Sequence, residues 1–210
     1  MNARRAVPLA GIAFVVLAIV AAIVGGETPD VNDSAQDVVS FYVDNGSDQQ
    51  WAAAILALGC VGFLFFLGAL RGTLRAAGGD EGGFSTIALL GGVMITVGIA
   101  IFSGIGFTLG DAADDIPAAA TLALNALNSD LFFPVAVGTV AFNLGLALAV
   151  LRHGGLPRPL GWLALVLGIA GVLGPVGFFA FIATGIVVVW ASIAMAQGAR
   201  ATDRPPTTVT

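Results

Sequence analysis

Six runs of apolar residues, none holding a charged side chain, constrain the fold of this chain more than any other feature. They occupy residues 7–25, 51–70, 84–109, 131–151, 159–174 and 176–197. A helix needs roughly 20 apolar residues to cross a bilayer core about 30 Å thick. The short fifth run meets the sixth at Gly174-Pro175, and one kinked helix over both would be too long for a single crossing. The sequence therefore predicts an all-α bundle of six transmembrane helices.

The basic residues predict how these helices are oriented. All eight are Arg, and they lie before the first run, after the second, between the fourth and fifth, and after the sixth. In a six-span chain these positions share one side of the membrane, which the positive-inside rule makes cytoplasmic. Most of the 13 acidic residues fall on the other side. We expect both termini in the cytoplasm.

The first run and the overall composition bear on localisation. A cleaved signal peptide is the alternative for the first run, but no A-x-A site follows at 22–28, so we expect an uncleaved helix. Heavy use of Ala, Gly and Val without Lys is typical of a GC-rich bacterial genome. The sequence indicates a multi-pass protein of a bacterial plasma membrane. We expect one domain over residues 1–197, followed by a disordered cytoplasmic tail at 198–210.

Two acidic segments connect the runs on the outer side. In the first, residues 27–50, Ser34 and Asp37 resemble a capping box, and Val38, Phe41 and Tyr42 follow at helical spacing. The second predicts a helix over 117–128, with Pro117 at an early helical position. We expect short extracellular helices that rest on the bundle or on the lipid surface.

Two alternatives for these outer segments stay open. An EF-hand is rejected because Ala35 and Phe41 replace the Gly and Glu that its loop needs, yet looser divalent cation binding by the outer carboxylates stays an alternative to a solvated face. Residues 33–109 and 112–174 could also be two copies of one hairpin unit, although helical hairpins resemble one another by chance.

The predicted spans hold no ionisable residue, and this absence argues against catalysis. Charged side chains inside a membrane are costly and mark proton relays or substrate sites. A Walker A motif is impossible without Lys, and one Cys and one His cannot form the usual metal or haem sites. We expect no enzyme activity, no cofactor and no metal site.

Uncharged polar residues and small residues remain in the spans. A possible polar facet inside the membrane, serving either as interhelical hydrogen bonds or as a ligand or pore surface, comprises Thr96, Ser103, Thr139 and Asn143. Small residues at four-residue steps allow close helix packing, and the candidates are Gly92, Ala100, Gly104, Ala141 and Gly145. We predict close packing between the third and fourth spans.

Three segments carry a resemblance to known sequences: SAQDVVSFY (34–42), FLGALRGTLR (66–75) and LPRPLGWLALVLGI (156–169). With them the chain resembles uncharacterised actinobacterial multipass membrane proteins of a domain-of-unknown-function type. The resemblance implies an integral membrane protein and supplies no activity.

Two functions follow from these observations. The first is a non-enzymatic, accessory or structural membrane protein that acts through membrane lipids, a membrane protein partner or a second copy of itself, without nucleic acid. The alternative is a transporter or channel for a neutral or apolar small molecule, for which the facet at Thr139 and Asn143 would be the pathway.

Overall fold

The regular elements of this chain are helices throughout the described residues. The computed structural model describes residues 3–78, 80–130, 132–173 and 175–202. The elements in chain order are α1 (Ala3–Gly25), α2 (Ala35–Asp44), α3 (Gly46–Ala76), the short 3-10 helix η1 (Glu81–Gly83), α4 (Phe84–Ala112), α5 (Ala118–Asp130), α6 (Phe132–His153), α7 (Arg158–Ala170) and α8 (Pro175–Thr202). The predicted all-α class is confirmed.

Five stretches among the described residues are long and apolar enough to cross a membrane: Ala6–Gly25, Gly46–Ala76, Phe84–Ala112, Ala118–His153 and Val176–Gly198. The fourth of them takes in α5 together with α6. The remaining apolar helix, α7, has 13 residues and rises about 20 Å, less than the bilayer core. A sixth full-length span is therefore not confirmed. The two separate helices α7 and α8 do agree with the predicted hairpin.

The end of α8 lies beyond the predicted start of the tail. This helix continues to Thr202, so that residues 198–202, predicted to be disordered, are helical. The sequence Gly-Ala-Arg-Ala-Thr contains no Pro, and Pro205-Pro206 is the first strong helix breaker after it. The rest of the predicted tail lies outside the described residues.

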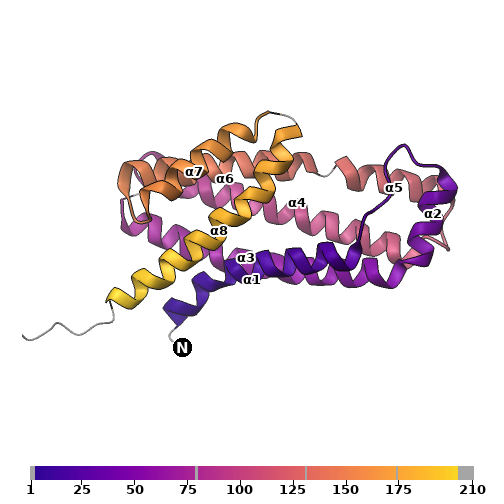
Figure 1. Ribbon diagram of the computed structural model, residues 1–210, viewed down its shortest axis with the longest axis horizontal. Helices are drawn as coiled ribbons and strands as arrows, with labels where there is room; N and C mark the ends of the chain where they lie inside the picture. The colour runs from indigo at the N-terminus through magenta and orange to yellow at the C-terminus, as the bar shows by residue number, and fades with distance from the viewer. Residues whose placement is uncertain (1–2, 79, 131, 174, 203–210) are drawn as a thin grey trace, which may run out of the picture.

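The bundle is elongated and its two ends differ. Figure 1 shows α1, α3 and α4 running along the long axis, with α2 and α5 at one end and the N-terminus at the other. In the packing order, α1 lies against α3 and α8, α4 against α3 and α6, and α7 against α6 and α8. We call the end with α2, α5 and the 26–34 loop the acidic end. The end where α3 stops and α4 and α7 start is the arginine end.

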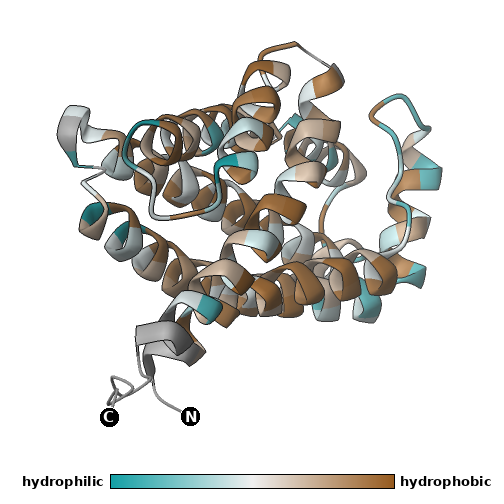
Figure 2. Ribbon diagram, turned by 60° about the vertical axis from the view of Figure 1, so that its left-hand side comes forward, coloured by the Kyte–Doolittle hydropathy of each residue, from teal (hydrophilic) through white to brown (hydrophobic). Residues whose placement is uncertain are grey.

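Apolar side chains fill the interior of the bundle and also cover its sides. The largest fully buried ones include Phe63, Phe66 and Phe142. Figure 2 shows hydrophobic residues along most of the helix length and hydrophilic residues in the loop between α1 and α2. Exposed apolar residues on the sides include Ile23 and Phe65, at 75% and 61% exposure. A surface of this kind matches a lipid environment and not water.

The closest helix contact joins α4 and α6. A Cβ atom built on Gly91 would lie 2.2 Å from the backbone nitrogen of Phe142, and one on Gly145 would lie 2.5 Å from that of Ala88. Glycine at these positions lets the two backbones touch. The predicted close packing of the third and fourth spans is confirmed.

A cap at the acidic end is built as its sequence predicts. The Ser34 hydroxyl accepts the Asp37 backbone N–H at 3.2 Å and donates to the Asp37 carboxylate at 2.7 Å, which fixes the start of α2. Val38 and Tyr42 are then buried against Leu109 and its neighbours. The predicted helix and its apolar edge are therefore confirmed, and that edge rests on the bundle.

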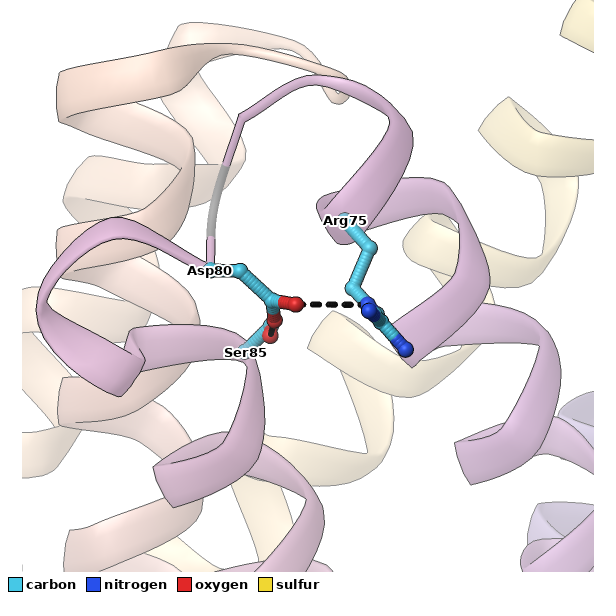
Figure 3. Close-up of polar contacts among 3 residues, drawn as sticks. All are labelled: Arg75, Asp80 and Ser85. Carbon is cyan, nitrogen blue, oxygen red and sulfur yellow. Dashed lines mark hydrogen bonds and ion pairs between the residues drawn. The ribbon is translucent and has the colours of Figure 1, made fainter.

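At the arginine end, a polar cluster closes the turn between α3 and α4. Figure 3 shows the Asp80 carboxylate between Arg75 and Ser85; the Arg75 Nε lies 2.6 Å from it and the Ser85 hydroxyl donates to it. The Ser85 hydrogen bond, with help from Arg75 and Arg71, lowers the pKa of Asp80 against the opposing effect of desolvation. Asp80 therefore stays negatively charged at pH values below the ordinary pKa of an aspartate.

Candidate functional site

The buried face of α5 is polar. Its buried residues are Thr121, Asn125 and Asn128, which follow one another at the i, i+4, i+7 spacing of a single helix face. Leu127, on another side, is half exposed. The helix thus turns its polar residues toward the bundle, where each side chain needs a partner.

Asn125 finds its partners in the cap. The Tyr42 hydroxyl donates to its Oδ1 at 2.8 Å, and its Nδ2 donates to the Pro29 carbonyl at 3.3 Å. Burial raises the pKa of Tyr42 to about 12, so the phenol stays protonated and remains a donor at neutral pH. Asn125 therefore ties α2 and the 26–34 loop to α5.

The Asn128 Oδ1 is buried without a hydrogen-bond partner, as are the Thr121 Oγ1 on the same face of α5 and the Asn143 Oδ1 on α6. Asn128 is only 6% exposed. An unsatisfied buried acceptor costs roughly 1–3 kcal/mol, and native structures contain few of them. The residue Asn128 also borders a cavity, although its Oδ1 is itself fully buried.

The cavity has a volume of about 510 Å³ and lies where six helices and the 26–34 loop converge. It is lined by Phe14, Ala18, Thr28, Leu56, Ile99, Phe102, Asn125, Asn128, Ser129, Phe132, Val135, Phe178 and Phe181. The polar residues come from α5 and the loop at the acidic end, and the aromatic and aliphatic ones from the helices of the bundle. The volume falls within the range of small-molecule sites, about 300–1,000 Å³.

Two further hollows adjoin this cavity. One, of about 250 Å³, shares Thr28 and Asn128 with it and also reaches Gln49 and Ser103. The other is an apolar groove of about 650 Å³ between α1 and α8, and it shares Phe14 and Phe181 with the cavity. Ala18 lines all three. The cavity therefore shares its walls with a polar hollow near α5 and with an apolar groove on the side of the bundle.

The polar facet predicted from sequence lies mostly inside packed helices. The hydroxyls of Thr96 and Thr139 donate to carbonyls of their own helices at 2.8 Å. The Asn143 Nδ2 donates to the Thr184 hydroxyl at 2.8 Å, joining α6 to α8. Ser103 donates to the Ile99 carbonyl at 2.9 Å and borders the 250 Å³ hollow. The structure does not bring these four residues together into one surface.

The predicted small residues also take different roles. Gly92 faces α3, where an added Cβ would meet the Leu67 side chain at 2.3 Å, whereas Gly104 has open space around it. Ala100 is exposed and Ala141 half-buried. Gly145, on α6, faces α4, because an added Cβ there would meet the α4 backbone. The four-residue ladder therefore winds around α4 and serves several neighbours.

Carboxylates gather beside the cavity. An open hollow of about 360 Å³ is lined by Glu27, Thr28, Pro29, Asp30, Asp33, Asp37 and Phe41, and it shares Thr28 with the cavity. Within the described part of the chain, no group of three or more His, Cys, Asp or Glu residues is arranged to hold a metal ion. We call the four carboxylates of this hollow, from Glu27, Asp30, Asp33 and Asp37, the acidic rim.

The comparisons with known proteins place no relative beside this chain. Neither a protein-family profile, nor a curated protein, nor a solved structure matches it. The function must therefore be argued from the geometry.

Proposed function

We propose that this chain is a non-enzymatic protein of a bacterial plasma membrane that binds an amphiphile in the cavity at the acidic end. The apolar chain of the ligand would lie against Phe14, Phe178 and Phe181, and its head would reach Asn128. The observation that carries this proposal is the largely apolar cavity of about 510 Å³, closed at one end by the buried Asn128 amide.

The apolar groove between α1 and α8 supports entry from the lipid side. It shares Phe14 and Ala18 with the cavity, and its lining is almost entirely apolar. A ligand already dissolved in the bilayer would pass through it without exposing its chain to water. Binding of this type needs no catalytic residue, which fits the absence of ionisable residues in the predicted spans.

Transport of a neutral molecule through the bundle is less well supported. Thr96, Thr139 and Asn143 were the expected pathway residues, and they line none of the four hollows described above. Their hydrogen bonds to their own helices and to Thr184 instead supply a structural role.

Native mass spectrometry of the purified full chain tests amphiphile binding. We expect a population carrying one amphiphile per chain that survives release from a non-ionic detergent micelle. Protein that stays bare after lipid is added back would contradict the proposal.

We further propose six membrane-inserted helices with both termini in the cytoplasm. The support is the charge partition, since Arg71, Arg75, Arg152 and Arg158 lie at the arginine end and the acidic rim at the opposite one. The helix α7 starts at the arginine end and α8 returns to it. The orientation of the other helices is therefore the same whether or not α7 crosses the full bilayer.

Cysteine labelling tests the orientation in cells. In a Cys60→Ala background, Ser47→Cys at the acidic end is expected to react with an impermeant maleimide added outside. Ala76→Cys, on the exposed end of α3, is expected to react only after the membrane is opened. The reverse pattern would overturn the orientation.

A further inference from the structure

The amide of Asn128 has one fully buried atom and one accessible atom. Its Oδ1 is fully buried, whereas its Nδ2 keeps accessible surface and donates no hydrogen bond to any described residue. Asn128 is only 6% exposed, and it lines both the cavity and the adjoining 250 Å³ hollow. An amide nitrogen carries two N–H donors and accepts nothing. The polar atom that this buried residue offers to the cavity is therefore a donor without an acceptor.

The other polar side chains at this end of the cavity leave one more donor. The Asn125 Nδ2 donates to the Pro29 carbonyl, and the Asn125 Oδ1 accepts from Tyr42. The Ser129 hydroxyl donates to the Asn125 carbonyl at 3.1 Å. The exposed Thr28 hydroxyl has no hydrogen-bond partner among the described residues and lines the same two hollows as Asn128. A ligand head at this end is therefore held by accepting hydrogen bonds.

The charges around the cavity favour a neutral head. None of the described residues that line it is acidic or basic. An ionised head would lose its water there without gaining a counter-charge, which is costly. The acidic rim shares Thr28 with the cavity and further opposes an anion. Among hydrogen-bond acceptors, a carboxylate or phosphate is therefore unsuited to this site, whereas a carbonyl oxygen brings no charge.

We propose that the cavity selects neutral amphiphiles whose head presents a carbonyl oxygen, as a fatty ester or a long-chain ketone does. This inference rests on the proposed function and names the chemical class of its ligand. The carbonyl oxygen accepts from the Asn128 Nδ2, and the Thr28 hydroxyl supplies a second donor at the same end. The alkyl chain lies among the aromatic residues of the lining. Such a molecule has no N–H or O–H group, so burying its head leaves no ligand donor unpaired.

The carbonyl stretching band of a bound ester tests this selection. Methyl decanoate is added to the full chain in a non-ionic detergent without carbonyl groups, and its infrared band is recorded. The same measurement on an Ala18→Trp variant, whose cavity is filled, is subtracted. We expect a difference band at lower wavenumber than that of the ester in dry hydrocarbon, because a hydrogen bond to the oxygen weakens the C=O bond.

Competition measures the size of the preference. Dodecane, decanoate and decylamine are each titrated against bound methyl decanoate at equal mole fraction in the micelles. Dodecane matches the ester in chain length and lacks its head. We expect dodecane to bind about fivefold more weakly than the ester, as the loss of one neutral hydrogen bond predicts. Decanoate and decylamine are also expected to compete less well than the ester, because each would bring an unpaired charge into the cavity.

Two variants on the same face of α5 assign the donor. Asn128→Leu is expected to return the difference band to higher wavenumber and to remove the preference for the ester over dodecane, while dodecane still binds. Asn128 makes no hydrogen bond to the described chain, so the substitution breaks none. Thr121→Val is its control, since the Thr121 Oγ1 is also buried without a partner and Thr121 lines none of the four hollows. We expect Thr121→Val to keep both the band shift and the preference.

Each outcome bears on one claim. Equal binding of methyl decanoate and dodecane, or tighter binding of decylamine or decanoate, would overturn the head-group inference and leave amphiphile binding intact. An unshifted band in the wild-type chain, or a shift that survives in Asn128→Leu, would also overturn it. If no ligand bound the wild-type chain better than Ala18→Trp, the proposed function itself would fail.

Discussion

Replacing Gly91 by Ala is expected to lower the unfolding temperature by about 5 °C or more, whereas the same change at Gly104 is expected to leave it unchanged or raise it. Both glycines lie within α4. A Cβ on Gly91 would stand 2.2 Å from the Phe142 nitrogen and 2.8 Å from the Gly138 oxygen, so α4 and α6 must move apart. At Gly104 an added Cβ meets open space.

The expected free-energy changes favour a lower unfolding temperature for the Gly91 variant than for the Gly104 variant. Alanine is better than glycine in a helix interior by about 1 kcal/mol, and this gain applies at both positions. Overpacking typically costs about 1–3 kcal/mol, and more where backbone must shift. For a chain of this size, 1 kcal/mol corresponds to about 2–4 °C. The overpacking at Gly91 should therefore exceed the gain in helix propensity, which alone acts at Gly104.

Thermal unfolding in detergent, followed by the loss of the monodisperse peak in size-exclusion chromatography, gives the measurement. Equal unfolding temperatures for the two variants would show that α4 and α6 do not touch at Gly91. A rise at both positions would show the same, because propensity alone would then explain the data.

Ala18→Trp is expected to abolish retention of the amphiphile while leaving the fold intact. Ala18 borders the cavity, the 250 Å³ hollow and the groove between α1 and α8. An indole there fills the space in which the ligand chain would lie, and the hollows can accept it without displacing a helix. Occupancy by native mass spectrometry should fall at least tenfold.

Ala13→Trp is the matched control for this variant. It places the same side chain on the same helix at an exposed position, so its general effect on α1 should be similar. We expect it to retain the ligand at the wild-type level. Equal loss in both variants would indicate damage to α1, and equal retention would place the ligand outside the cavity.

The sequence predicted the membrane helices better than it predicted their contacts. Absence of charge over long runs determines which segments enter a membrane, so α1, α3, α4, α6 and α8 lie close to their predicted ranges. Residues 159–174 were the exception, because α7 ends at Ala170, with Gly171 as its C-cap. Hydropathy alone does not show that a helix ends there. The pattern of small residues indicated close packing of the third and fourth spans but not the residue at the closest contact, since Gly91 lay outside the predicted set.

The candidate site was missed for a different reason. The predicted candidates were polar residues inside the apolar runs, whereas Asn125 and Asn128 belong to α5, a connecting segment of mild hydropathy. A signal was present, since Thr121, Asn125 and Asn128 repeat at helical spacing. Sequence periodicity does not state which side of a helix faces the bundle. That choice depends on α2, whose Tyr42 bonds to Asn125.

Density in the cavity at the acidic end tests the central claim most directly. A structure of the full chain in lipid nanodiscs should show one elongated non-protein feature that starts at the Asn128 side chain. It should continue along Phe14 and Phe181 toward the groove between α1 and α8. A cavity filled only by ordered water, or closed by side chains that bring a protein donor to Asn128, would contradict the account.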